Sequence, residues 1–391
     1  METEADKLAF CLLIQFCITL VSASGAAMEE PMLRPGERIT ANAQSLNVGA
    51  QAIPCVCDWN NDGRKDLIVG YRYDDKLALF LNQGTDANPA FGTFENLQAA
   101  GADIVHLGSA CGAPAPWVCD YDGDTKKDLL VGTGTEGYVY FYRNTNTDDN
   151  PVLVAGVRLT MGGSTLSVGA RATPYVHDWD EDGLNDLLCG DVNGNVHLFR
   201  NVGTVGSPSY ASDTFIQANG VPADFGLRSA IRVLDWDGDG LKDLVGSASD
   251  NASWCKNVGT NAAPDLMAPA RLQAPEEGIG LTNIDTGYRM RLEVVDWNDD
   301  NVTDLIIGTH DGYVVFYEGY DFAITAVEIQ NESETAIQWN SALYLTYNVW
   351  CGETPANLSP VATGLISGGK TTSWSETPAG NTRFYRVQLA E

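Results

Sequence analysis

The sequence predicts an all-β protein, a five-bladed β-propeller followed by a small β-sandwich of the immunoglobulin or fibronectin III type. Two observations support this prediction. An acidic nine-residue segment occurs five times along the 391-residue chain, at intervals of 57 to 62 residues. Short apolar segments bounded by turn residues fill each interval, and no long helical periodicity is present. Repeats of this length with four short strands each are typical of propeller blades.

The acidic segment keeps the same residue types at positions 1, 3, 5 and 9 of every copy. The five copies begin at Asp58 (DWNNDGRKD), Asp120 (DYDGDTKKD), Asp178 (DWDEDGLND), Asp235 (DWDGDGLKD) and Asp296 (DWNDDNVTD). An apolar strand follows each copy directly, as in DLLCG at 186–190. The spacing therefore places each acidic segment in a loop between two strands of one blade.

The third copy shows how a blade is built. An extended run (GARATPYVHDW) leads into the acidic loop, and the strand at 186–190 follows. A turn at 191–194 precedes an alternating strand that ends in a glycine turn, and an outer strand completes the repeat. Stacking against neighbouring blades would bury both faces of such a four-stranded unit.

The fifth repeat lacks an outer strand of its own, because its third strand runs directly into a different sequence pattern. The segment before the first loop, RITANAQSLNVG, resembles the outer-strand segments of the later repeats. We therefore expect this N-terminal segment to complete the fifth blade and close the ring, which would remove exposed sheet edges.

Three segments divide the chain. Residues 1–27 contain an apolar run and small residues suited to cleavage, and they predict a signal peptide. Residues 31–320 hold the repeats of the propeller. Residues 323–391 contain alternating segments such as ITAVEIQ and LTYNVWCG, and their roughly six strands predict the sandwich. No other segment could cross a bilayer, so the mature chain is expected to have no membrane span.

The net charge of −29 argues against nucleic acid as a partner, because no basic patch could neutralise phosphates. The acidity has a local origin, since 18 of the 20 side chains at positions 1, 3, 5 and 9 are Asp and two are Asn. Seven cysteines follow the signal segment, an odd number. Cys57 and Cys119 share a repeat position with His177, Leu234 and Val295, which favours small buried cysteines over a disulfide framework.

Hard oxygen ligands at alternate residues of a tight loop suit Ca²⁺. Side chains at positions 1, 3, 5 and 9 would bind the ion, and position 7 would offer its backbone carbonyl. The predicted side-chain ligands are Asp58, Asn60, Asp62, Asp66, Asp120, Asp122, Asp124, Asp128, Asp178, Asp180, Asp182, Asp186, Asp235, Asp237, Asp239, Asp243, Asp296, Asn298, Asp300 and Asp304. The predicted carbonyl ligands are those of Arg64, Lys126, Leu184, Leu241 and Val302. Up to five Ca²⁺ ions, one per blade, are expected.

Position 6 of the loop requires a left-handed backbone, which glycine adopts most easily. Three copies have Gly63, Gly183 and Gly240 there, and the fifth has Asn301, the next most favourable residue type. The second copy has Thr125, a β-branched residue that should be strained at this position. We expect calcium to be mainly structural, because it would hold together carboxylates that otherwise repel one another.

The pattern DxDxDGxxDLxxG, repeated at blade length, resembles the FG-GAP/VCBS repeats of integrin α-subunit propellers and of many secreted bacterial proteins. The resemblance covers residues 31–320 and implies Ca²⁺ in the loops between the first and second strands. The C-terminal segment, which ends in RFYRVQLAE, looks like small β-domains appended to some secreted bacterial proteins. Localisation is accordingly predicted as secreted or extracellular, with the periplasm and the cell surface as variants.

Two further sets of residues recur in the repeats. Position 2 of the loop is always aromatic, which indicates packing between blades, with sugar stacking as the alternative. Gln51, Arg171, Arg228 and Arg289 lie seven residues before a loop, where the first strand of a blade should line the central channel. The arginines could form a partial cationic ring that binds an anion or acidic sugar, or they could pair with the acidic loops.

The sequence favours a binding or adhesion module for a carbohydrate or an extracellular or cell-surface protein, since propellers present variable loops on one face. The alternative is a polysaccharide-degrading enzyme, a lyase or hydrolase built on the propeller. No catalytic residues are proposed, because no nucleophile–base pair or unique acid–base cluster breaks the symmetry of the repeats.

Overall fold

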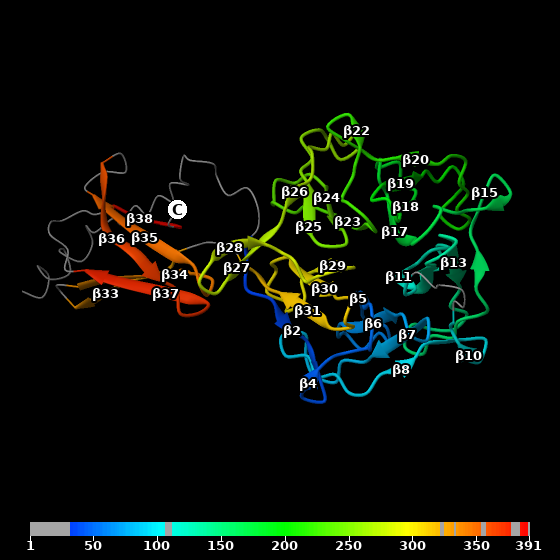
Figure 1. The fold of residues 1–391 in the computed structure, drawn as a ribbon, viewed down its shortest axis with the longest axis horizontal. Coiled ribbons are helices and arrows are strands. Elements are labelled where there is room, and N and C mark those ends of the chain that lie inside the picture. Colours follow the sequence, from blue (N-terminus) through cyan, green and yellow to red (C-terminus); the bar gives the residue numbers. More distant parts are fainter. Residues whose placement is uncertain are drawn as a thin grey trace, which may run out of the picture. The chain divides into compact units, whose positions relative to one another are not determined.

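The computed structural model describes residues 32–105, 112–320, 324–331, 334–352, 357–376 and 384–389, which form strands and turns and no helix (Figure 1). The described part of the chain accordingly offers no helix able to cross a membrane. The predicted signal peptide, residues 1–27, lies outside the described residues. The chain forms two compact units, one of residues 36–273 and 283–319 and one that includes residues 274–282 and 320–391.

The first unit contains five four-stranded antiparallel sheets, the five predicted blades. The first strands are β5 (Ile53–Cys57), β11 (Ala115–Cys119), β17 (Thr173–His177), β23 (Ala230–Leu234) and β29 (Arg291–Val295). The second strands are β6 (Asp66–Tyr71), β12 (Asp128–Gly132), β18 (Asp186–Gly190), β24 (Asp243–Ser247) and β30 (Asp304–Gly308). The third strands are β7 (Lys76–Phe80), β13 (Val139–Tyr142), β19 (Val196–Phe199), β25 (Ala252–Cys255) and β31 (Val314–Tyr317). The outer strands are β8 (Glu95–Asn96), β14 (Val157–Arg158), β20 (Thr214–Phe215), β26 (Ala270–Arg271) and β2 (Glu37–Arg38).

The sheets are arranged in a closed ring with the first strands innermost. Each first strand contacts the first strands of both neighbouring blades, and β29 contacts β5. The outer strand of the fifth blade is β2, which pairs with β31 in the register Glu37↔Phe316 and Arg38↔Val315. The predicted closure by the N-terminal segment is therefore confirmed, and the fifth blade has no unpaired outer edge on β31.

A short hairpin that the sequence did not predict follows the outer strand of every blade. The hairpins are β3 (Thr40–Ala41) with β4 (Gln44–Ser45), β9 (Gln98–Ala99) with β10 (Ala102–Asp103), β15 (Thr160–Met161) with β16 (Ser164–Thr165), β21 (Gln217–Ala218) with β22 (Val221–Pro222), and β27 (Gln273–Glu276) with β28 (Gly280–Asn283). Four of these hairpins form an isolated parallel β-bridge with a residue of the next blade, as Ala41 does with Phe91. The strands of four hairpins have two residues each, too few for periodicity to be recognised in a sequence. In the fourth blade β27 and β28 have four residues each.

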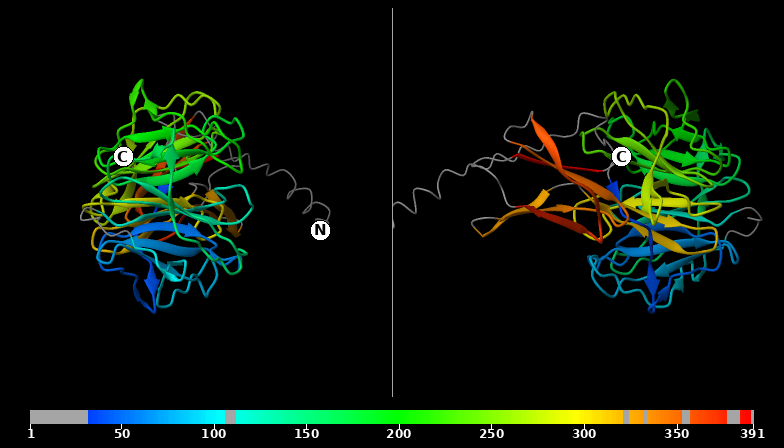
Figure 2. Two further views of the ribbon diagram at one scale, coloured as in Figure 1. Left: turned by 90° about the vertical axis from the view of Figure 1, so that its right-hand side faces the viewer. Right: turned by 60° about the vertical axis from the view of Figure 1, so that its left-hand side comes forward.

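The second unit contains two three-stranded sheets, ordered β33-β34-β37 and β36-β35-β38, which the right-hand view of Figure 2 shows as two layers. The strands are β33 (Ile324–Asn331), β34 (Glu334–Asn340), β35 (Thr346–Gly352), β36 (Leu358–Ile366), β37 (Thr371–Glu376) and β38 (Phe384–Leu389), and β1 (Met32–Leu33) pairs with β32 (Gly319–Tyr320). Trp339, Tyr347 and Val387 come from both sheets and share one apolar core. That these two sheets form a β-sandwich of the immunoglobulin or fibronectin III type remains a prediction.

Ring closure depends on a close contact at the start of the outer strand, and this contact can be tested. A Cβ atom on Gly36 would lie 2.6 Å from the Tyr317 ring, and one on Gly156 would lie 2.5 Å from the Tyr142 ring. We expect Gly36→Val to displace β2, to cost roughly 1–3 kcal/mol and to expose residues 36–48 to limited proteolysis. Gly156→Val is the matched control, because its outer strand directly continues its own blade. Equal protection of residues 36–48 in both variants would contradict the proposed role of this contact.

Candidate functional site

The acidic loops lie where the sequence predicts them, between the first and second strands of every blade. Position 6 is left-handed in all five loops, with φ of 81° at Gly63, 69° at Thr125, 87° at Gly183, 87° at Gly240 and 66° at Asn301. Position 4 is also left-handed in every loop, as at Asn61 with φ 56°. The loop thus turns twice in succession, and this brings alternate side chains to the same side of the backbone.

The carboxylates at positions 1 and 5 stabilise these turns by accepting backbone hydrogen bonds within the loop. In the first loop, Asp58 accepts the N–H groups of Asp62 and Gly63 at 3.0 and 2.9 Å. Asp62 in turn accepts the N–H of Arg64 at 3.1 Å. The same contacts recur in the third loop, where Asp178 accepts the N–H of Gly183 at 3.0 Å. The loop conformation is therefore fixed by its own acidic side chains, which explains its exact repetition in sequence.

The aspartate at position 9 is buried and joins three separate segments of its blade. Asp66 accepts the N–H of Trp59 at the loop start through Oδ2, at 3.0 Å, and the N–H of Asn82 after the third strand through Oδ1, at 2.7 Å. Burial raises the pKa of this carboxyl group to about 6 in the first four blades and to about 7 at Asp304. Position 9 therefore has a structural role that the sequence interpretation, which treated it only as a ligand, did not include.

Buried asparagines continue this connection toward the outer strand. The Oδ1 atom of Asn144 accepts the N–H groups of Asn146 and Val152, each at 3.0 Å. Asn82, Asn201 and Asn257 make the equivalent pairs of hydrogen bonds. In the fifth blade Gly319 donates its N–H to Asp304 in place of an asparagine, at 2.7 Å. No loop to an outer strand has to be held there, because β2 supplies that strand.

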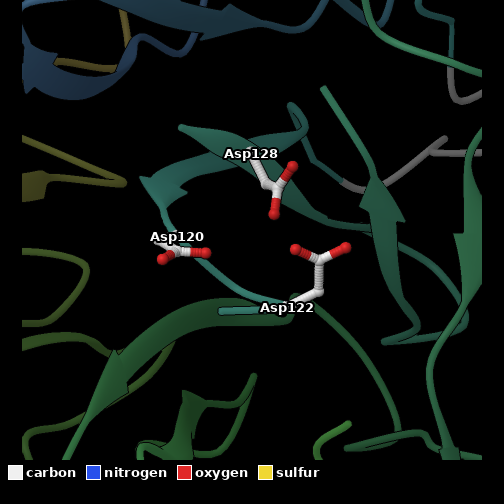
Figure 3. A group of neighbouring side chains, drawn as sticks. All are labelled: Asp120, Asp122 and Asp128. Carbon is white, nitrogen blue, oxygen red and sulfur yellow. The ribbon is translucent and has the colours of Figure 1, made fainter. Parts of the chain in front are cut away.

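Ligand atoms converge in three loops on groups that could hold a metal ion. These groups are Asp120 with Asp122 and Asp128, Asp178 with Asp180 and Asp182, and Asp235 with Asp237 and Asp239, and the ligand atoms of each group lie within 4.8 Å of one another. Figure 3 shows the carboxylates of the first group turned toward a common point. Loops one and five place Asn60 and Asn298 at position 3 of the same loop conformation.

Unpartnered oxygens in these loops test whether a cation fits. The Oδ1 atoms of Asn60, Asp120 and Asp180 are buried and accept no hydrogen bond within the described structure. A buried oxygen without a donor is unfavourable by about 1–3 kcal/mol. A hard divalent cation would satisfy these oxygens, so the donor set fits Ca²⁺.

Basic side chains accompany the aspartates at position 3, a feature that the sequence interpretation missed. Arg143 contacts Asp122 at 2.7 Å, Arg200 contacts Asp180, and Lys256 contacts Asp237. All three bases immediately precede the buried asparagine after the third strand. Where position 3 is Asn60 or Asn298, that place holds Leu81 or Glu318. The base is thus present only where position 3 carries a negative charge.

The aromatic residues at position 2 pack between blades, as predicted. Trp59, Tyr121, Trp179, Trp236 and Trp297 are all buried. Trp297 of the fifth blade stacks on Phe91 of the first at 6.0 Å, and the hydroxyl groups of Tyr121 and Tyr210 from adjacent blades lie 3.2 Å apart. The alternative of sugar stacking on these rings is excluded by their burial.

Gln51, Arg171, Arg228 and Arg289 occupy equivalent places two residues before a first strand, and Ala113 is their counterpart in the second blade. All four have left-handed backbones, with φ between 50° and 68°. Arg228 donates to the Ser249 hydroxyl at 2.8 Å and Arg289 to the Gln51 side-chain oxygen at 3.0 Å. For Arg228 and Arg289 the predicted pairing with the acidic loops is wrong, because arginine and loop lie at opposite ends of the first strand.

Two buried layers of first-strand side chains lie below these residues. Arg291, the first residue of β29, is 1 % exposed. The third residues of the first strands include Trp117 in β11, Arg232 in β23 and Glu293 in β29. Arg232 makes a bidentate ion pair with Glu293 at 2.6 and 2.8 Å. The Arg232 guanidinium also lies over the Trp117 ring, 4.7 Å from its centroid. The sequence interpretation missed Arg291, because its place in the repeat holds apolar residues or Thr173 in the other blades.

Six of the seven cysteines that follow the signal segment lie among the described residues, and no disulfide bond joins any two of these six. They are Cys55, Cys57, Cys119, Cys189, Cys255 and Cys351, whereas Cys111 lies outside the described residues. Burial raises the pKa of the Cys255 thiol to about 12. The expectation of small buried cysteines is thus confirmed for Cys55, Cys189, Cys255 and Cys351, and Cys57 and Cys119 are partly buried.

Comparison with known proteins identifies the repeats. Residues 178–246 match the family described as FG-GAP-like repeat. The chain is 30% identical over 188 residues to integrin alpha-4 of Xenopus laevis, a match that covers 43% of this chain and 17% of the integrin. The chain thus contains FG-GAP-like repeats, and it spans less than a fifth of the length of that relative. The narrower resemblance to secreted bacterial members remains a prediction.

Solved structures with some similarity include a Photorhabdus luminescens Tc holotoxin pore, at 11% identity and a TM-score of 0.34 over 82% of this chain and 16% of the toxin chain. A lectin from Agrocybe aegerita, described as recognising non-reducing terminal N-acetylglucosamine, aligns at 15% identity and a TM-score of 0.34. That alignment covers 89% of this chain and 96% of the lectin.

The strain at Thr125 gives a direct test of the loop geometry. A left-handed backbone costs a residue with a side chain about 1–2 kcal/mol, and glycine offsets part of this gain by about 0.5–1 kcal/mol of conformational entropy. We expect Thr125→Gly to raise the free energy of unfolding by up to about 1 kcal/mol, measured by urea denaturation. Gly183→Thr in the third loop is the reverse control and should lower stability. A loss of stability in Thr125→Gly would contradict the shared loop geometry.

Proposed function

We propose that this chain of FG-GAP-like repeats is an extracellular calcium-binding β-propeller that acts as a binding or adhesion module for a carbohydrate or an extracellular protein. The signal-like residues 1–27 and the acidic loops support an extracellular location, where calcium is millimolar and sites of modest affinity, about 10⁻⁴ to 10⁻³ M, are occupied. Neither nucleic acid nor a membrane is a proposed partner.

Calcium would be held by side chains at positions 1, 3 and 5, by the carbonyl at position 7 and, as in the group of Asp120, Asp122 and Asp128, by position 9. The bound ion supplies positive charge that neutralises the loop carboxylates and satisfies their unpartnered oxygens. The chain itself keeps the loop turned and joins it to the outer strand through Asp66 and its equivalents. Calcium therefore stabilises the ring, and ligand recognition belongs to residues that differ between blades.

One observation carries the proposal of a binding module. The five loops repeat the same structure, whereas the residues at the inner edge of the ring do not, since Gln51, Ala113 and three arginines occupy equivalent places. Left-handed backbones at Gln51 and the arginines cost about 1–3 kcal/mol each, and such strain clusters at ligand sites. These residues can bind and orient a ligand, and they supply no pair of carboxyl groups for acid–base catalysis.

The proposal is tested by a binding and depolymerisation screen with polysaccharides and extracellular matrix proteins, in calcium and in EDTA. Retention of a ligand in calcium without new chain ends supports the binding module. New reducing or unsaturated ends would instead establish the alternative, a polysaccharide lyase or hydrolase. Absence of retention on every polysaccharide and every matrix protein would contradict the proposal.

Removal of calcium should destabilise the propeller. Without the ion, three or four carboxylates in each loop repel one another and several buried oxygens lose their partner. We expect excess EDTA to lower the melting temperature by roughly 10 °C or more, since about 1 kcal/mol corresponds to roughly 2–4 °C in a domain of this size. Differential scanning calorimetry with added calcium or magnesium is the measurement. An unchanged melting temperature, with no metal detected by mass spectrometry, would refute calcium binding.

The bases beside position 3 should weaken calcium binding, because Arg143, Arg200 and Lys256 compete for the same oxygens. We expect Arg143→Gln to increase calcium affinity roughly three- to tenfold, a change of about 0.7–1.4 kcal/mol, and to lower the melting temperature in EDTA. Isothermal titration calorimetry of the single variants is the measurement. Arg158→Gln, on the outer strand of the same blade, is the control. Weaker calcium binding by Arg143→Gln would show that the base supports the ion.

A further inference from the structure

Four arginines gather at the inner edge of the ring, where the first strands begin. This arginine cluster consists of Arg171, Arg228, Arg289 and Arg291. The guanidinium groups of Arg228 and Arg289 lie 4.6 and 4.9 Å from the centroid of the same ring, that of Tyr288. A Cβ atom on Gly112 would lie 3.0 Å from Nη1 of Arg171 and 3.6 Å from Nε2 of Gln51. Gln51 accepts a hydrogen bond from Arg289. Gln51 therefore connects the surroundings of Arg171 with the two arginines that lie over Tyr288.

Three arginines of the cluster, Arg228, Arg289 and Arg291, have no carboxylate partner among the described residues. Arg291 donates only to its neighbour's carbonyl oxygen, on Met290, at 2.8 Å. The Nε atoms of all three arginines are buried and have no hydrogen-bond partner among the described residues. Like charges at low dielectric are costly unless a counter-charge is present.

The next layer of the ring shows how the same fold balances a buried arginine. Arg232 has its own carboxylate, Glu293, in a bidentate pair, and aromatic rings cover it. Trp117 and Tyr175 also contact each other in this layer, with ring centroids 4.6 Å apart. A ligand can reach the cluster where Tyr288 is 50% exposed and Arg228 and Arg289 are half-buried.

Arg291 lies deepest in the cluster. Burial, together with the charges of Arg171, Arg228 and Arg289, lowers the pKa of this guanidinium to about 9. A bound anion would remove this destabilisation by supplying the missing negative charge. Two half-buried guanidinium groups and one buried group together offer N–H donors of the kind that bind planar or tetrahedral anions.

We propose that the arginine cluster is an oxyanion site in which Arg228, Arg289 and Arg291 bind a carboxylate, sulfate or phosphate group. Nε2 of Gln51 has no hydrogen-bond partner in the described structure and is available to the groups that carry the anion. The assignment of the anion to an acidic polysaccharide, with uronate or sulfated sugars, rests on the proposed binding function. A free inorganic anion has the same chemistry and is the second source that the experiment distinguishes.

The test uses the full chain with calcium and compares the wild type with Arg228→Gln/Arg289→Gln. Arg158→Gln is the matched control, because Arg158 also lies over tyrosine rings, at 4.5 and 5.5 Å, but on an outer strand. Melting temperatures are measured in sulfate, phosphate and chloride at equal ionic strength. Titration calorimetry follows with uronate oligosaccharides, sulfated oligosaccharides and their neutral counterparts.

We expect sulfate and phosphate to raise the melting temperature of the wild type and of Arg158→Gln above its value in chloride. The double variant should lose this shift, and in chloride it should melt at a higher temperature than the wild type because two like charges are gone. Equal shifts in the double variant, or no difference between oxyanions and chloride in the wild type, would overturn the proposal.

The saccharide titrations separate the two proposals. Acidic saccharides that bind at least tenfold more tightly than sulfate, with that gain lost in the double variant, support a polysaccharide ligand at this site. Arginine-dependent binding of sulfate without any saccharide binding supports the oxyanion site and contradicts a carbohydrate ligand. Saccharide binding that is unchanged in the double variant supports the binding function and overturns this site.

Discussion

The buried carboxylate at position 9 is the interaction on which the rest of each blade depends. Asp66, Asp128, Asp243 and Asp304 each tie the start of the acidic loop to the end of the third strand, across the second strand on which they lie. Asp186 accepts the N–H of Asn201 at the end of its third strand, at 2.7 Å. A buried carboxylate that accepts backbone N–H groups exchanges solvation for directed bonds. Because the asparagine after the third strand is held in the same network, the position of the outer strand follows from it. The fifth blade keeps the carboxylate and replaces the asparagine with Gly319, since β2 comes from elsewhere in the chain.

Much of this architecture could be predicted because the residues that determine it repeat. Five copies of one loop identified the blades, their order and the need for an N-terminal strand to close the ring. The left-handed position 6 followed from Gly63 and its equivalents, and the structure extends it to Thr125. Four hairpins were missed because their two-residue strands carry no periodic signal, and the hairpin of the four-residue strands β27 and β28 was missed as well. Arg143, Arg200 and Lys256 were missed because their contacts with the loop depend on how the third strand returns past it.

The residues that break the repeat were harder to interpret. Gln51 and the three aligned arginines could be selected from their spacing, but their partners could not be deduced, since a sequence does not say which end of a strand a charge can reach. Arg291 lies two residues after Arg289, at the first position of β29. The residues at that position of the other first strands are Ile53, Ala115, Thr173 and Ala230. A charged residue in an apolar repeat position is a signal in itself. Its meaning depends on the three neighbouring arginines, which come together only when the ring closes.

The length of the first strand separates the two charged regions of the propeller. Arg171, Arg228 and Arg289 each lie seven residues before the loop that follows, a distance of at most about 23 Å at roughly 3.3 Å per residue. A direct ion pair needs its charged groups within about 4 Å of each other, so none forms over this distance. The acidic loops therefore cannot balance the arginines, although the chain as a whole carries a net charge of −29. The two proposed sites follow this separation, with a cation at the loops and an anion at the inner edge. A strongly acidic protein could in this way present a site for an acidic ligand.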